Sequence, residues 1–223
     1  MKNLLPTIEL FKKSFDIYQK KVWLLVNIIF FSFLGLVVLL PSILIILLMS
    51  GFLKGHVFSL NQILFSILLG LVSLFFIILF GLWAKVALLC AVREKEVDLK
   101  KILSIAWGKL GSFFWISFLS SVAIMGGYLL LIVPGIIFSV WFAFSLYIFI
   151  AEGLKGKSAL KRSKQLVQGI WWPVFGRIVA LGVIALLISW IKFFGPIINA
   201  FFMIPFSVVY MYALYDDVKR VKD

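Results

Sequence analysis

The sequence predicts an all-α integral membrane protein with six membrane-spanning helices arranged as three hairpins. Apolar residues make up 64% of the 223 residues, and the mean hydropathy is +1.16, which is outside the range of soluble domains. Several apolar stretches exceed the roughly 18 residues that a helix needs to cross a bilayer. Most of the lysines and arginines gather at 2–21, 93–109, 155–164 and 219–222. Because cytoplasmic loops are enriched in these residues, both termini are expected in the cytoplasm.

The predicted elements repeat one unit, which consists of an amphipathic interfacial helix, a span, a turn and a returning span. Interfacial helices are expected at 4–21, 98–110 and 157–168, and spans at 22–49, 62–92, 113–133, 136–151, 172–191 and 197–215. In each of the segments 14–23, 104–113 and 163–172, an aromatic residue follows a serine by nine positions. This recurring spacing suggests three copies of the unit, with convergence as the alternative. No linker divides the chain, so a single domain, 1–223, is expected.

The first interfacial helix carries an apolar stripe at helical spacing, formed by Leu4, Ile8, Phe11, Phe15, Tyr18 and Val22. This stripe is expected to face the membrane interface, another helix of the same protein, or both. Trp23 marks the headgroup level at the start of the first span, which Pro41 is expected to kink.

The second unit begins at Asp98, a residue type that caps helices. In the helix that follows, one face is shared by Leu99, Ile102, Leu103, Ala106 and Leu110. Pro134 and Gly135 are expected to form the outer turn before the fourth span. That span is short, because 136–151 rises only about 24 Å as a helix.

The third unit has the most polarised interfacial helix. Its apolar side carries Ala159, Ser163, Leu166 and Val167, and its polar side carries Lys157, Lys161, Lys164 and Gln168. The next span tolerates Pro173 in its first turn, and Gly195 and Pro196 are expected to turn the chain outside the membrane.

A few charged groups lie near the predicted inner boundary. Lys85 and Arg177 are inside apolar runs, and Glu152 ends the fourth span. One interpretation is that the two cations snorkel to the surface and Glu152 is a carboxylate at a helix end. Another is an ion cluster in which Glu152 pairs with Arg177 while Lys85 faces Asp216 or Asp217. The third interpretation is an anion or lipid phosphate bound by Lys85 and Arg177. The candidate headgroup ligands are Lys85, Arg177, Lys157, Lys161, Arg162 and Lys164.

Catalytic chemistry is not expected. The chain lacks a phosphate-binding glycine loop and the common hydrolase and metalloprotease motifs. The lone histidine, His56, has no neighbouring metal-ligand partners and is expected to be a loop residue. The lone cysteine, Cys90, excludes an intramolecular disulfide. We therefore expect no enzyme activity, metal or cofactor, and the basic clusters are attributed to membrane topology and not to nucleic acid.

The leading hypothesis is a non-catalytic, multi-pass protein of the cytoplasmic membrane. Its basic amphipathic helices would engage anionic lipids of the cytoplasmic leaflet and organise lipid or an accessory partner, which could be a second copy or another membrane protein. The alternative is a transporter or channel for a small anionic or lipid-like substrate, because Pro41 and Pro205 interrupt two spans and the cations Lys85 and Arg177 lie within two others.

A family resemblance is carried by a group of motifs in the second half of the chain. They are Val133-Pro134-Gly135-Ile136-Ile137, Trp141, Glu152-Gly153, Ala159-Leu160-Lys161-Arg162-Ser163, Gly169, Trp172 and Phe175-Gly176, with Leu10-Phe11-Lys12-Lys13-Ser14-Phe15 near the start. Together they resemble the membrane domain that precedes some bacterial glycerophosphoryl diester phosphodiesterases, and related prokaryotic membrane proteins. The resemblance implies a six-helix membrane domain acting near lipid headgroups. It does not imply phosphodiesterase activity, because the family's soluble catalytic domain is missing here.

Overall fold

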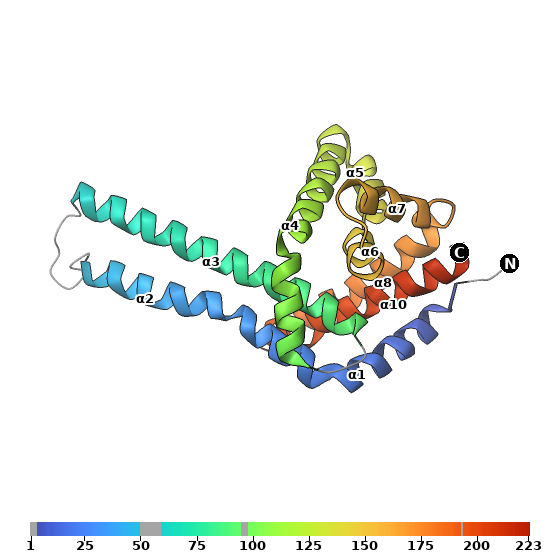
Figure 1. Ribbon diagram of the computed structural model, residues 1–223, viewed down its shortest axis with the longest axis horizontal. Coiled ribbons are helices and arrows are strands. Elements are labelled where there is room, and N and C mark those ends of the chain that lie inside the picture. The colour runs from blue at the N-terminus through green and yellow to red at the C-terminus, as the bar shows by residue number, and fades with distance from the viewer. Residues whose placement is uncertain (1–3, 50–58, 95–97, 193) are drawn as a thin grey trace. The chain divides into compact units, whose positions relative to one another are not determined.

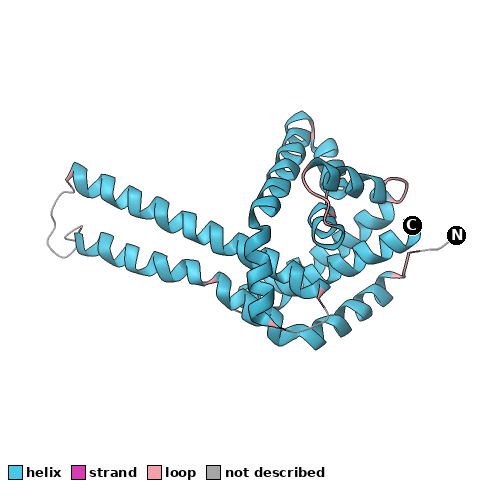
Figure 2. Cartoon of the chain, viewed as in Figure 1, coloured by secondary structure: helices cyan, strands magenta, loops and turns pink. Residues whose placement is uncertain are grey.

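The computed structural model describes residues 4–49, 59–94, 98–192 and 194–223, and nearly all of these are helical (Figure 2). The predicted all-α class is confirmed for this part of the chain. The loop position assigned to His56 lies outside the described residues. The chain divides into two compact units, one formed by Asn27–Lys85 and the other by Met1–Val26 with Val86–Asp223. The expectation of a single domain stays a prediction.

The Asn27–Lys85 unit is an apolar helical hairpin. It contains the end of α1 (Thr7–Ser32), all of α2 (Leu34–Met49) and most of α3 (Leu60–Arg93). Within it, the rings of Phe31 and Trp83 meet edge to face at 6.2 Å, and Ser73 donates a hydrogen bond to Ser42 at 3.0 Å. Many of its leucines and phenylalanines are exposed, as expected for helices that face lipid.

The predicted first span, 22–49, is not one helix. α1 continues without a break from the predicted interfacial helix through Trp23 to Ser32, and Phe33 separates it from α2. α2 then runs through Pro41 to Met49. With 16 residues, α2 rises about 24 Å, less than the hydrocarbon thickness of about 30 Å. Because α1 runs unbroken across the predicted boundary between interfacial helix and span, no helix end marks that boundary.

The other unit begins with the first turns of α1, which pack on α10 (Ile204–Lys222). The ring of Phe11 lies 4.6 Å from that of Tyr210, and Tyr18 meets Phe206 at 5.8 Å. The buried residues of α1 in this unit are Leu10, Ser14, Tyr18, Leu24 and Leu25. Of the other members of the predicted stripe, Ile8 and Phe15 are 72% and 50% exposed, so their expected contact with the membrane interface stays a prediction. Periodicity predicts which apolar residues share one face of α1, whereas packing against α10 decides which edge of that face is buried.

Lys21 joins α1 to the end of α3. Its ammonium group donates hydrogen bonds to the carbonyl oxygens of Ala91 at 2.7 Å and Val92 at 3.1 Å, and also to that of Glu94. These carbonyls end a helix, where backbone acceptors lack partners and a positive charge is favourable. Lys21 is therefore a structural residue within this unit.

The second predicted interfacial helix and the third predicted span form one continuous helix, α4 (Leu99–Leu130). Asp98 caps it by accepting a hydrogen bond from the Lys100 amide at 3.0 Å, as predicted. Of the predicted apolar face, Ile102 and Ala106 are buried. In the part of α4 that follows Ile116, Gly127 is the one buried residue. The second half of this helix therefore projects from the core.

The turn after α4 is made by Leu131, and the predicted turn at Pro134 and Gly135 was wrong. Leu131 is extended, and α5 (Ile132–Trp141) already contains Pro134 and Gly135 in its first turn. A side-chain carbon on Gly135 would lie 2.4 Å from the ring of Tyr128. These two residues therefore start α5 and let it pack closely on α4, and they do not reverse the chain.

The predicted fourth span, 136–151, is split into α5 and α6 (Ser145–Glu152). α7 (Lys157–Val167) lies against the break, because Ser163 donates to the Trp141 carbonyl at 2.6 Å and accepts from the Phe144 amide at 3.2 Å. The predicted apolar face of α7 is confirmed, since Ala159, Ser163, Leu166 and Val167 are all buried. This face is covered by protein.

The last hairpin consists of α8 (Trp171–Ser189), α9 (Gly195–Ile198), a π-helical turn η1 (Asn199–Met203) and α10. Pro173 lies in the first turn of α8, as predicted. Gly195 is required at the turn, because a side-chain carbon there would lie 2.6 Å from the Ile188 carbonyl oxygen. α10 runs to Lys222 without a break at 215, so the predicted end of the last span is not a helix end.

Five helical segments in the described part of the chain are long and apolar enough to cross a membrane: Leu60–Arg93, Leu99–Leu130, Ile132–Glu152, Trp171–Ser189 and Gly195–Lys222. The predicted first span is not among them. The proposed repeat is also uneven, since the interfacial helix and span are continuous in α1 and α4 but separate in α7 and α8. Ser14 and Ser163 are buried, whereas Ser104 is exposed.

Candidate functional site

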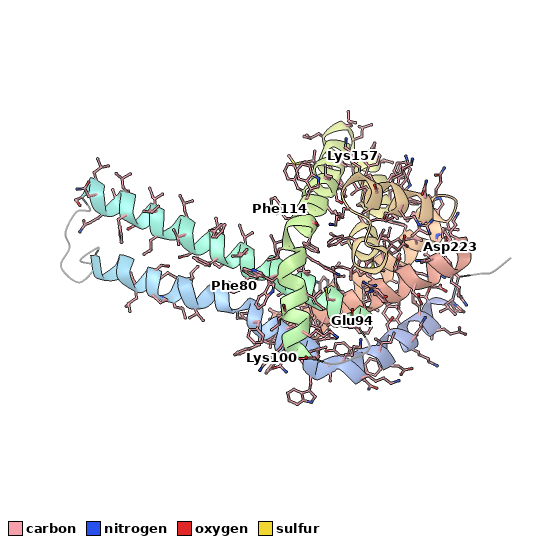
Figure 3. All side chains as sticks on the ribbon, in the orientation of Figure 1. Phe80, Glu94, Lys100, Phe114, Lys157 and Asp223 are labelled. Carbon is pink, nitrogen blue, oxygen red and sulfur yellow. The ribbon has the colours of Figure 1, made fainter. Side chains whose placement is uncertain are left out.

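An ion cluster joins α6, α7 and α10. Glu152 lies 3.5 Å from the Arg162 guanidinium and 3.1 Å from the Lys219 ammonium. The hydroxyl group of Tyr215 donates to the same carboxylate at 2.6 Å. Arg162 also pairs with Asp223 at 2.7 Å. The Glu152 side chain is only 16% exposed, so this cluster fixes α7 against the core (Figure 3 labels Asp223).

The cluster differs from the predicted one. Glu152 was expected to pair with Arg177, but its ion-pair partners in the described chain are Arg162 and Lys219. Arg177 instead donates to the carbonyl oxygens of Leu5 at 2.6 Å and Pro173 at 2.9 Å. It therefore ties the start of α1 to α8. The pairing was unpredictable from sequence because Lys219 is far from Glu152 along the chain.

Arg162 was a candidate headgroup ligand, but the structure uses it within the protein. The pKa of Arg162 is raised above its ordinary value, first by the hydrogen bond with Asp223 and then by the negative charges of Asp223 and Glu152, which together outweigh partial burial. A guanidinium held by two carboxylates contributes little free charge to an external anion.

The two adjacent aspartates have different partners. Asp217 is buried and accepts hydrogen bonds from the Leu5 amide at 2.8 Å and from Arg220 at 2.6 Å. Asp216 is exposed and pairs with Lys13 at 3.3 Å. Asp217 thus connects α10 to the residues before α1, and Asp216 adds an ion pair between α10 and α1 at the surface. Lys85 is exposed and belongs to the other unit, so its expected approach to these aspartates stays a prediction.

The remaining cations of α7 form an exposed cationic face, defined by Lys157, Lys161 and Lys164. They lie opposite the buried face of the helix, in agreement with the predicted two sides (Figure 3 labels Lys157 at the start of α7). The Lys164 ammonium lies 4.2 Å from the centre of the Trp141 ring. A cation over an indole face is attracted by the ring's quadrupole, which positions Lys164 beside a pocket that Trp141 lines.

An aromatic pocket lies between α5 and the start of α8. Its volume is about 390 Å³, and its lining consists of Val133, Ile137, Trp141, Gln168, Gly169, Trp171 and Trp172. Gly169 makes the turn before α8 with a positive φ of 87°. Lys222, at the end of α10, donates to the Gln168 carbonyl at 2.7 Å. The pocket therefore combines apolar walls with a lysine at its rim.

Sequence reasoning missed Lys219, Lys222 and Trp171 as parts of this site. Lys219 and Lys222 belonged to a recognised basic cluster, but nothing in the sequence placed that cluster beside α7. Trp171 immediately precedes the predicted span 172–191 and was not among the predicted site residues. The residues are joined by tertiary packing of α10 and α8, which local patterns do not encode.

A second cavity, about 620 Å³, lies between α8 and the η1–α10 segment. Its lining is mostly apolar, with Ser189, Asn199 and Ser207 as the polar members among the described residues. Asn199 donates to the Ser189 hydroxyl and to the Ala185 carbonyl oxygen. Among the described residues, no group of three or more acidic, histidine or cysteine side chains could bind a metal ion.

The long apolar helices are consistent with the class of integral membrane proteins. No family model, curated protein or solved structure matches the chain.

Proposed function

We propose that this protein is a non-catalytic integral membrane protein that binds anionic phospholipid headgroups of the cytoplasmic leaflet through the cationic face of α7. The observation that carries the proposal is the orientation of α7. Its apolar side is packed into the protein, while Lys157, Lys161 and Lys164 are exposed. A surface helix fixed in this way presents charge to the headgroups without inserting its own apolar face.

The electrostatic contribution is large enough to matter. A lysine near an anionic membrane surface contributes about 1 kcal/mol before screening, so three lysines contribute about 3 kcal/mol. Salt reduces this energy over a Debye length of about 10 Å. The resemblance to a membrane domain found beside glycerophosphodiesterases supports the same location near headgroups.

Replacing the three lysines by glutamine (K157Q/K161Q/K164Q) should lower the enrichment of phosphatidylglycerol over phosphatidylcholine in the lipid that co-purifies with the protein, by about tenfold at low salt. The measurement is mass spectrometry of lipid extracted from protein reconstituted in a mixed bilayer. K157R/K161R/K164R is the matched control, because it keeps the charge. Equal enrichment in the glutamine variant and the wild type would contradict the proposal.

The α8–α10 hairpin has the length and end residues of a complete crossing. α8 has 19 residues and rises about 28 Å, close to the hydrocarbon thickness. Trp171 and Trp172 begin it, Trp190 follows its last residue, and Lys192 lies in the turn. Tryptophan at both ends and a lysine beyond one of them favour contact with both membrane surfaces.

The α4–α5 hairpin lacks these features. Its tip, residues 129–133, is entirely apolar and exposed. α5 has 10 residues and rises about 15 Å, half of the hydrocarbon thickness. The 21-residue segment Ile132–Glu152 reaches a crossing length only together with α6, and the break between α5 and α6 is the point where Ser163 of α7 packs. α7 lies at the base of this hairpin, where it bonds to Trp141. The proposal therefore includes a hairpin that enters from the cytoplasmic side and ends inside the hydrocarbon.

Two further features favour this partial insertion. The Leu131 amide donates to Gly127 at 3.1 Å, the Gly135 amide donates to Leu131 at 3.4 Å, and Pro134 has no N–H group. Few backbone donors at the tip are thus left for water to satisfy. In Figure 1, α4 and α10 run in different directions, so both cannot follow the membrane normal. The α2–α3 and α8–α10 hairpins keep their proposed crossings, and both termini remain cytoplasmic.

The alternative, a transporter or channel for an anionic substrate, is less well supported. The larger cavity has an apolar lining in which no described residue is charged, and Arg177 is not part of it. Arg177 is already bonded to two carbonyl oxygens. An acyl chain suits such walls better than an anion does.

A further inference from the structure

We infer that the aromatic pocket between α5 and α8 binds a single anionic phospholipid, with the phosphate at the Lys164 and Lys222 rim and the upper part of an acyl chain against Val133 and Ile137. This inference rests on the proposed function and identifies a specific site within it. It differs from general attraction to charge, because a pocket with fixed walls should bind one molecule saturably.

The polar groups around the pocket are hydrogen-bond donors that suit a phosphate. Lys222 uses one of its three N–H groups on the Gln168 carbonyl, and Lys164 lies above Trp141 at 4.2 Å. The indole N–H of Trp171, a lining residue, is buried and has no hydrogen-bond partner among the described residues. A buried donor without a partner is costly, and a bound phosphate or ester oxygen would satisfy it.

The lining carries no acidic side chain in the described chain, so a negative ligand meets no repulsion there. The aspartate and glutamate nearest the rim are already paired, since Asp223 and Glu152 both bind Arg162. Positive charge at the rim is therefore left to Lys164 and Lys222. This charge pattern selects an anion over a zwitterionic headgroup.

The walls of the pocket suit an acyl chain. Val133, Ile137 and Trp141 recur at helical spacing along one side of α5 and form one wall, while Trp171 and Trp172 form the other. Trp172 is 74% exposed and Val133 is 65% exposed, so the pocket opens on its apolar side. An amphiphile can thus extend from the lysine rim towards the membrane interior. A soluble phosphoester would leave this apolar side without a partner.

Two substitutions test the site. Val133→Trp fills the pocket from an exposed position, and Lys222→Gln removes a rim cation. Val179→Trp, on an exposed position of α8 outside the pocket, and Lys155→Gln, an exposed lysine that does not line it, are the matched controls. Native mass spectrometry of the full-length protein in detergent would measure binding during titration with phosphatidylglycerol, phosphatidylcholine or glycerol phosphate.

We expect wild-type protein and both controls to bind one phosphatidylglycerol saturably, with affinity at least tenfold higher than for phosphatidylcholine, and glycerol phosphate not to bind. Val133→Trp and Lys222→Gln should each weaken that binding by about tenfold, with thermal melting used to verify folding. Unchanged affinity in both folded variants would overturn the pocket while leaving the bulk enrichment of the proposed function intact. Binding of glycerol phosphate as tightly as the lipid would overturn the phospholipid assignment.

Discussion

A cysteine placed at the tip of the α4–α5 hairpin should be protected from water-soluble reagents on both sides of the membrane. In a Cys90→Ser background, we expect Leu131→Cys to react with a membrane-impermeant maleimide roughly tenfold or more slowly than exposed loop positions, because maleimide chemistry requires a hydrated thiolate. The physical basis is the apolar tip, residues 129–133, and the short rise of α5.

Two matched positions give the reference rates. Lys192→Cys, in the turn of the α8–α10 hairpin, should react only from the outer side, and Lys161→Cys, on the exposed face of α7, only from the cytoplasmic side. Labelling in intact cells and in inverted vesicles separates the two sides. If Leu131→Cys reacts from outside as fast as Lys192→Cys, the hairpin crosses the membrane completely and the proposed partial insertion is wrong.

Removing the carboxylate of Glu152 should destabilise the protein more than removing any exposed carboxylate. Glu152→Ala leaves Arg162 and Lys219 without this partner and removes the acceptor of the Tyr215 hydroxyl. Breaking a fully buried ion pair costs about 3–5 kcal/mol. Because Arg162 and Lys219 are partly exposed, we expect about 2 kcal/mol, which lowers the melting temperature by about 5 °C.

The matched control is Glu9→Ala, which removes an exposed glutamate of α1 and should change the melting temperature little. Glu152→Gln is the second variant, because it keeps an acceptor for Tyr215 but removes the charge. Melting in detergent, followed by near-ultraviolet circular dichroism, reports the packing of α7 and α10. Equal melting temperatures for the Glu152 and Glu9 variants would show that the ion cluster does not stabilise the core.

The motifs that suggested a family resemblance have structural explanations in this chain. Gly135 permits close packing on Tyr128, and Gly153 and Gly169 adopt positive φ angles at helix ends. Ser163 connects α7 to the α5–α6 break, and Glu152 connects α6 to α7 and α10. These residues position the surface helix α7.

The sequence by itself determined the helical class, the apolar segments and the local signals that are read within one or two turns. Asp98 caps α4, Pro173 starts α8, and the two faces of α7 lie as predicted, because capping and periodicity depend only on neighbouring residues. Charge counting likewise needed no structure to identify the basic clusters.

Tertiary structure alone decided which face of α1 is covered, where the turn before α5 lies, and which cation pairs with Glu152. The covered face of α1 and the partner of Glu152 depend on contacts between residues far apart in sequence, such as Phe11 with Tyr210 and Glu152 with Lys219. The turn before α5 depends on the close packing of Gly135 against Tyr128. From sequence alone, several cations could have been the ion-pair partner of Glu152. Only the packing of α10 against α1, α6 and α7 decides which of them is. Local patterns specify helices, whereas the choice among equivalent partners is made when the helices pack.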